Sequence, residues 1–262
     1  MRKISKTLLE RLTAGDLKPL LKYIKSREEL RLEVRTHGEA FVYYRKGKAL
    51  EIGSMKADKK YGNVPEGKLA ISDPARYFRE MKMAIDEWLS VKKERGEFDT
   101  QQNIARWNQH SSGRYLVLDM EYAFERKKIV NKNPEKRAVF DLIGLDLELK
   151  RIVFFEVKKG MGATKGKSGI QEHIRDFNTY LFGENQELFR ANLMRDIKQI
   201  IADKNALGIL DYTFIPNDFE NSDPELVFVL HPYQDSEIKQ FTQELNNRYK
   251  LITVHDEDFV LR

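Results

Sequence analysis

The chain has 262 residues, enough to bury a substantial core in one large domain or in a domain with an accessory region. Its formal net charge is +5, and this mild basicity is compatible with a nucleic acid partner but does not by itself indicate one. The absence of cysteine excludes disulfides, thiolate zinc sites and cysteine nucleophiles. No run approaches the roughly 20 apolar residues of a membrane span, and charged residues interrupt the apolar positions near the N-terminus, unlike those of a signal peptide. We therefore expect a cytoplasmic protein without a membrane partner.

Residues 1–72 are expected to form an accessory region of helices and a small antiparallel meander. Leucine and isoleucine recur at helical spacing within residues 4–25, and Gly15 divides this stretch into two short helices. Within residues 30–52 the apolar positions alternate as they do in strands. This region is a candidate for recognising a substrate or partner.

The remaining residues, 73–262, are expected to form one domain that begins with two helices. Asp73 and Pro74 supply an N-cap and a proline at the first helical position, and an apolar stripe continues from there to about Lys93. A second helix is expected over residues 99–109.

Strands and helices follow one another through the rest of that domain. The apolar patterns predict strands at residues 115–124, 138–149, 152–158, 226–230 and 251–254, and helices from about residue 170, over 187–207 and over 236–249. This order predicts an α/β protein, more specifically an α+β arrangement in which helices flank a central mixed β-sheet.

The strand at residues 152–158 carries an acid and an amine among apolar neighbours. Because side chains alternate between the two faces of a strand, Glu156 and Lys158 share one face with Ile152 and Phe154. The other face is also apolar, as in a strand buried in the middle of a sheet. Charges buried there are costly unless they are paired or bound to an ion. Glu156 and Lys158 are therefore candidate site residues.

The preceding strand places a second acid near this pair. Asp141 lies among apolar residues of that strand. If residues 148–151 form a tight hairpin, Asp141 falls opposite Lys158 and diagonal to Glu156, and the three polar groups lie within roughly 5–8 Å of one another. The alternative is a structural salt bridge between Asp141 and Lys158, with Glu156 facing solvent.

Two carboxylates at one place suit magnesium, which prefers hard oxygen ligands and keeps several waters. Asp141, Glu156 and the backbone carbonyl of Val157 would supply such ligands, and manganese could substitute for magnesium. The metal would polarise a phosphoryl oxygen and lower the pKa of a bound water. Lys158 could orient or deprotonate the attacking water, or offset charge in the transition state. The pattern predicts a metal-dependent phosphodiester hydrolase.

This pattern resembles the motif of the PD-(D/E)XK nuclease superfamily. Asp141 precedes Glu156-Val-Lys158 by 15 positions, and Phe140 stands where the superfamily has proline. The expected helix, three strands and helix are similar to the core of that superfamily, so the resemblance implies a restriction-endonuclease-like core over about residues 97–181.

The resemblance also implies roles and partners. Asp141 and Glu156 would be metal ligands, Lys158 would be catalytic, and the substrate would be nucleic acid, most simply DNA cut with magnesium. Nucleases of this type often act as dimers, so a homodimer is one of the expected assemblies.

One further acid and two histidines are also considered as site residues. Glu121, on the neighbouring predicted strand, could join the catalytic site, as an added acid does in many similar nucleases, or could lie on a solvated face. His110 and His173 have no ligand-like spacing and are expected to be ordinary surface or core histidines.

The loop after the central strand is basic and rich in glycine. Lys159, Lys165 and Lys167, together with backbone amides before a helix, could hold a phosphate backbone; the alternative is a solvated loop. Gln171 could contact substrate or serve only as the capping-box partner of Ser168.

Two classes of function therefore remain. The first is a magnesium-dependent endonuclease or exonuclease. The second is a catalytically inactive nucleic-acid-binding or protein-interaction module of the same fold, in which the three charged residues are structural.

Overall fold

The computed structural model describes residues 1–91, 95–124, 138–161 and 169–262. Its contacts divide the chain into two compact units: the first consists of Met1–Arg106 and Arg195–Phe214, and the second of Trp107–Met194 and Ile215–Arg262. The first unit thus extends past residue 72 of the expected accessory region. Within the described ranges, no helix is both long and apolar enough to cross a membrane.

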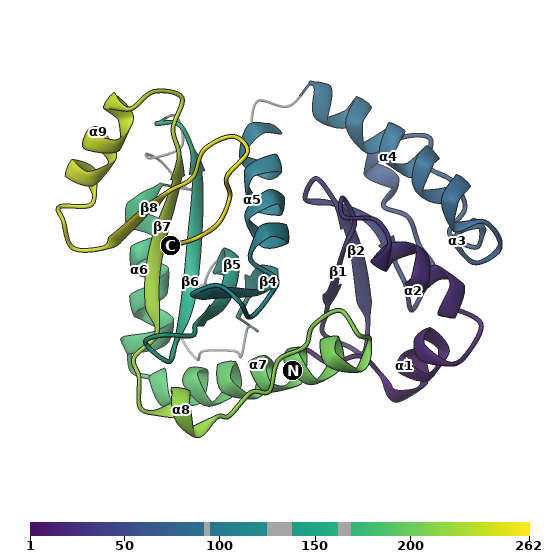
Figure 1. The fold of residues 1–262 in the computed structure, drawn as a ribbon, viewed down its shortest axis with the longest axis horizontal. Coiled ribbons are helices and arrows are strands. Elements are labelled where there is room, and N and C mark those ends of the chain that lie inside the picture. Colours follow the sequence, from purple (N-terminus) through teal and green to yellow (C-terminus); the bar gives the residue numbers. More distant parts are fainter. Residues whose placement is uncertain (92–94, 125–137, 162–168) are drawn as a thin grey trace, which may run out of the picture. The chain divides into compact units, whose positions relative to one another are not determined.

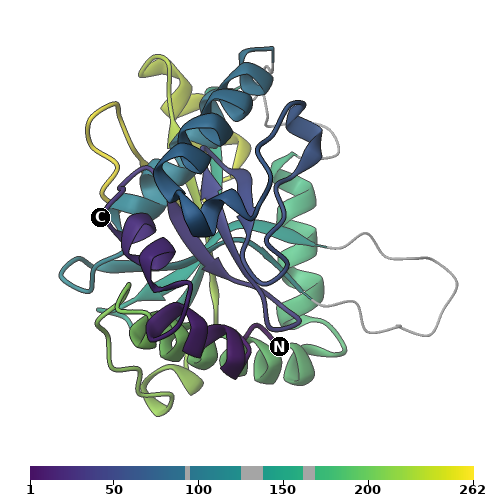
Figure 2. The same cartoon turned by 90° about the vertical axis from the view of Figure 1, so that its right-hand side faces the viewer.

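The first unit contains a three-stranded antiparallel sheet with helices beside it. Its elements are α1 (Lys6–Thr13), α2 (Lys18–Lys25), β1 (Arg31–Val34), β2 (Ala40–Tyr44), β3 (Gly47–Glu51), η1 (Lys59–Tyr61), α3 (Leu69–Ser72), α4 (Pro74–Ser90), most of α5 (Arg95–Trp107) and the C-terminal part of α7 (Gln186–Ala206). The strand order β1-β2-β3 confirms the predicted meander. Figure 2 shows α4 lying alongside these strands.

The predicted first residue is correct for α4 but not for α5. Asp73 caps α4 by accepting the Arg76 N–H, with Pro74 at the first helical position, as predicted. The start of the next helix was predicted wrongly at residue 99: α5 begins at Arg95. The Asp99 carboxylate accepts two hydrogen bonds of 2.6 Å from Arg45. It is therefore engaged by another element and does not cap a helix.

The second unit is built on a five-stranded mixed sheet. Its elements are β4 (Tyr115–Ala123), β5 (Val139–Asp146), β6 (Arg151–Lys159), α6 (Ile170–Phe182), the N-terminal part of α7, α8 (Asn217–Glu220), β7 (Glu225–His231), α9 (Ser236–Glu244) and β8 (Lys250–Thr253). The order is β4-β5-β6-β7-β8; the first three strands are antiparallel, and β7 and β8 run parallel to β6 (Figure 1). The chain is therefore a mixed α/β protein, as expected, and β6 is the central strand of its larger sheet.

Aromatic rings fill the side of this sheet that faces α6. Phe154 of β6 lies 4.8 Å from Phe140 of β5 and 5.7 Å from Phe177 of α6, measured between ring centroids. Phe124 stacks on Tyr180, also of α6, at 4.7 Å. Such pairs contribute about 0.5–1.5 kcal/mol each beyond the burial of their area. This packing fixes α6 against the strand that carries the candidate site.

The last predicted helix is shorter than its apolar pattern suggested. Residues 236–249 were expected to be helical, but α9 ends at Glu244. Asn246 and Asn247 both adopt positive φ, at 51° and 56°. Asparagine tolerates this left-handed conformation better than most residues, and two in succession end the helix.

Candidate active site

Glu156 and Lys158 lie on the central strand with almost no exposure to solvent. The residues are 1% and 2% exposed, although both are charged types. Lys158 Nζ donates a 2.6 Å hydrogen bond to Glu156 Oε1, so the two charges form a buried ion pair. The alternative in which Glu156 faces solvent is therefore wrong.

The hairpin before β6 has a different register from the predicted one. A tight turn over residues 148–151 was expected, but the last strand pair is Asp146 with Arg151, and a loop of residues 147–150 joins the strands. The Asp146 carboxylate accepts the N–H groups of the next residues in this loop, which stabilises the wider turn. The register consequently shifts by two residues.

This shift changes the neighbour of Asp141. The ladder between β5 and β6 ends at Leu142 with Phe155, and one further step places Asp141 at the level of Glu156, not opposite Lys158 as predicted. Beyond the last pair, Asp141 Oδ2 accepts a 2.9 Å hydrogen bond from the Val157 N–H. The carboxylate thereby occupies the place of a backbone acceptor and brings the two acids together.

His173 of α6 joins this group, although no ligand-like spacing in the sequence marks it. Its Nε2 atom lies 2.9 Å from Glu156 Oε1, an ion pair when the ring is protonated. The ring reaches β6 because α6 packs on the same face through Phe177 and Phe154. His173 is therefore a largely buried histidine beside the Glu156 carboxylate. No local pattern marks this position, because only the packing of α6 on the sheet brings the ring to Glu156.

Burial and neighbouring charges shift the protonation equilibria of this group. Burial, and then the nearby Asp141 carboxylate, raise the pKa of Glu156 above its ordinary value, and Lys158 and His173 offset only part of this rise. For His173, burial alone would lower the pKa, but the Glu156 and Asp141 carboxylates outweigh it and the pKa is raised. The site therefore holds protons that solvent-exposed groups of the same types would release more readily.

One oxygen of this group has no partner. Glu156 Oε2 is buried and accepts no hydrogen bond from any described residue. A buried carboxylate oxygen without a partner is costly, so it points to a ligand that would satisfy it. Together with the adjacent Asp141 carboxylate, it is a donor set of hard oxygens, which suits magnesium.

This donor set does not suit every metal. The described residues contain no group of three or more acidic or histidine side chains placed to hold a metal ion. Zinc sites need such a set, because zinc takes three or four protein ligands. Magnesium takes one or two carboxylates and fills its remaining positions with water and substrate oxygens, so Asp141 and Glu156 fit magnesium better.

The other predicted site residues lie in different surroundings. The β4–β5 register places Glu121 on the neighbouring strand at the level of Asp141, partly exposed and with a φ of 55°. Lys159 Nζ lies 2.8 Å from His231 Nε2 at the ends of the parallel strands β6 and β7, so it is engaged there. Gln171 is exposed on α6.

The basic loop lies mostly outside the residues that the structure describes. Lys165, Lys167 and Ser168 fall in the undescribed stretch 162–168. The N-cap of α6 is Gly169, with no side-chain cap, and the predicted capping box of Ser168 with Gln171 lies outside the described residues because Ser168 does.

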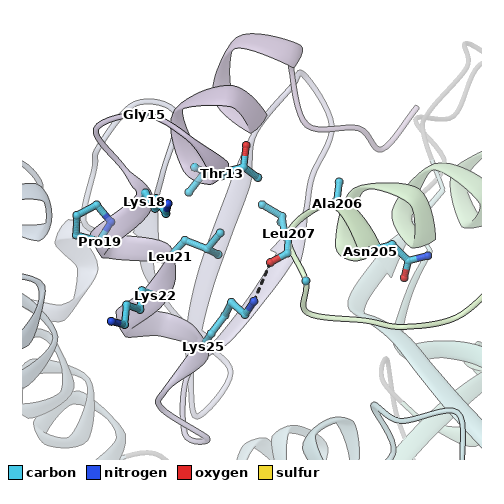
Figure 3. Close-up of a pocket in the computed structure, with 12 residues that line it drawn as sticks. Thr13, Gly15, Lys18, Pro19, Leu21, Lys22, Lys25, Asn205, Ala206 and Leu207 are labelled. Carbon is cyan, nitrogen blue, oxygen red and sulfur yellow. Dashed lines mark hydrogen bonds between the residues drawn. The ribbon is translucent and has the colours of Figure 1, made fainter.

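A separate hollow lies in the first unit, between α2 and the C-terminal end of α7 (Figure 3). It has a volume of about 880 Å³, Leu21 and Leu207 are among the residues that line it, and Lys25 Nζ donates a 3.2 Å hydrogen bond to the Leu207 carbonyl. The described residues that line it include no acid and no histidine. It therefore offers no carboxylate or imidazole ligand to a metal ion, unlike the group on β5 and β6.

Comparison of the chain with protein-family models, with curated proteins and with solved structures found no match in any of the three.

Proposed function

We propose that the chain is a magnesium-dependent nuclease that hydrolyses phosphodiester bonds, most simply in DNA. The observation that carries this proposal is the group on β5 and β6, in which Asp141, Glu156 and Lys158 gather and the buried Glu156 Oε2 accepts no hydrogen bond from any residue that the structure describes. Burying charged groups on a central strand is energetically unfavourable, and such groups are found more often where they serve a function.

Each residue of the group has a role in this proposal. Asp141, Glu156 and the Val157 carbonyl would hold magnesium, which when bound polarises a phosphoryl oxygen and lowers the pKa of a water. Lys158 could orient or deprotonate the attacking water, or offset negative charge at the phosphoryl group. Because its Nζ lies 2.6 Å from a carboxylate oxygen, we favour the role of a cation.

The order of elements supports the same proposal. The helix α5, the antiparallel strands β4, β5 and β6, and the helix α6 follow one another as expected for the core of the PD-(D/E)XK nuclease superfamily. The Asp141 and Glu156-Val-Lys158 spacing resembles the motif of that superfamily. We therefore propose a restriction-endonuclease-like core in the second unit, with nucleic acid as the substrate.

A second candidate is a catalytically inactive nucleic-acid-binding or protein-interaction module. The observation that favours it is that Lys158 Nζ and His173 Nε2 lie 2.6 Å and 2.9 Å from Glu156 Oε1, so Lys158, and His173 when protonated, already compensate the Glu156 carboxylate. In this case the group would stabilise the packing of α6 on the sheet.

A substrate panel separates the two candidates. Purified protein is incubated with single- and double-stranded DNA and RNA, each with magnesium, with manganese and with a chelator. The nuclease predicts cleavage of at least one substrate that the chelator abolishes. Absence of cleavage on every substrate with every metal would contradict it, and salt-dependent binding of the uncut nucleic acid would then favour the inactive binding module.

A further inference from the structure

The two carboxylate oxygens of Glu156 differ in the contacts that they make. Oε1 accepts a 2.6 Å hydrogen bond from Lys158 Nζ and lies 2.9 Å from His173 Nε2, an ion pair when the ring is protonated, whereas no described residue gives a hydrogen bond to the buried Oε2. The two nitrogen atoms come from different elements, β6 and α6. The side chain is therefore fixed at one oxygen and left open at the other.

Lys158 alone does not fix the orientation of this carboxylate. The terminal torsion of glutamate is broad, so a single contact leaves the carboxylate plane free to rotate and does not fix the direction in which Oε2 points. A second nitrogen on the same oxygen, approaching from the helix, removes this freedom. The imidazole is suited to the task because its ring is rigid and its side chain is only 16% exposed.

We propose that His173 is a positioning residue that, with Lys158, holds Glu156 Oε1 so that Oε2 faces a divalent cation. This inference rests on the proposed function, because it assigns Glu156 to a metal site. Groups that orient metal-binding carboxylates typically change metal affinity by about 10- to 100-fold when they are removed. His173 does not itself bind the metal in this account.

The inference is tested by metal binding, without reference to cleavage. Isothermal titration with Mn²⁺ is carried out on the wild-type chain, on His173→Ala and on His173→Gln. We expect the alanine variant to bind Mn²⁺ about 10- to 100-fold more weakly. The glutamine variant, whose amide can donate to the same oxygen, is expected to lie between it and the wild type.

A matched control removes a histidine elsewhere in the same unit. His110 is exposed, so His110→Ala should keep the wild-type Mn²⁺ affinity. Equal or tighter binding by His173→Ala, or a glutamine variant as weak as the alanine variant, would overturn the positioning role. Absence of Mn²⁺ binding by the wild type would instead contradict the proposed function, and the inference with it.

A second measurement covers the case in which His173→Ala does not fold. The NMR signals of the His173 imidazole are assigned by their loss in His173→Gln, and Mg²⁺ is then added to the wild type. A ring in contact with a metal-binding carboxylate should show a change in these signals as Mg²⁺ saturates the site. Unchanged signals at saturation would overturn the inference.

Discussion

Glu156 and Lys158 lie at positions of the central strand where apolar residues are expected, and each compensates the buried charge of the other. Both side chains are at most 3% exposed, and their ion pair is supplemented by His173 from α6. In a buried site, the loss of one partner leaves a charge that water cannot reach and that the remaining groups compensate only in part. Removal of one partner should therefore destabilise the sheet more than replacement of both by uncharged residues.

We expect Lys158→Ala to lower the free energy of unfolding by about 3–5 kcal/mol, because it leaves the Glu156 carboxylate buried without its closest cation. The double substitution Glu156→Gln with Lys158→Met removes both charges at similar volume and should recover most of that loss. Urea denaturation in the presence of a chelator measures both values. Lys239→Ala, at an exposed position of α9, is the control and should change stability by less than about 0.5 kcal/mol. A double variant as unstable as the single one would contradict the pairing argument.

At the scale of elements, the hairpin of β5 and β6 decides which residues meet in the site. Asp146 fixes its loop: Oδ1 accepts the N–H groups of Glu148 and Leu149, each at 3.0 Å, and Oδ2 accepts Arg114 Nη2 at 2.8 Å. Burial alone would raise the pKa of Asp146, but Arg114 and the two backbone groups outweigh it and the pKa is lowered. The turn therefore needs the ionised carboxylate.

The pH dependence of this turn follows from that direction. Because the folded pKa of Asp146 lies below its ordinary value of 3.8, its stabilisation is fully present above that pH and is lost as the pH falls through the folded pKa. We expect Asp146→Asn to lose about 1–3 kcal/mol at neutral pH and to flatten the acid limb of the stability profile. Thermal unfolding between about pH 2 and pH 7 measures this against Glu148→Gln, an exposed neighbour. Equal acid limbs in the wild type and Asp146→Asn would refute the assignment.

The neighbouring pair, β4 and β5, depends on one glycine. A Cβ atom on Gly144 would lie 2.4 Å from the Leu116 carbonyl oxygen, closer than any real contact, and the obstacle is backbone. We expect Gly144→Ala to force these strands apart and to cost at least about 1–3 kcal/mol. Gly113→Ala is the matched control, since the nearest atom there is 3.9 Å away. Urea denaturation of both variants decides this, and equal stability would contradict the strand register.

At the scale of the whole molecule, the order of strands and helices could be predicted from apolar periodicity and caps. Asp73 with Pro74 predicted the start of α4, and the doubly apolar pattern of residues 152–158 predicted a central strand. Local signals failed where a distant partner decides the outcome. Arg45 engages Asp99, so the apparent helix start at that residue was misleading.

Only part of the candidate site could be predicted, because distant partners also decide how its residues are arranged. Asp141, Glu156 and Lys158 could be selected because charges on an apolar strand are visible in the sequence. The register of β5 against β6 could not be predicted, since it depends on how the Asp146 carboxylate accepts N–H groups of the loop. His173 could not be selected either, because only the packing of α6 on the sheet brings it to Glu156.

The most direct test of the central claim is the rate of magnesium-dependent DNA cleavage by the wild-type chain and by Asp141→Asn. The substitution keeps the shape of a partly exposed side chain and removes one proposed metal ligand. Asp235→Asn, an exposed aspartate before α9, is the matched control. The account predicts that the wild type and the control cleave DNA with magnesium, and that Asp141→Asn is at least about 100-fold slower while unfolding normally. Cleavage by Asp141→Asn at the wild-type rate would contradict it.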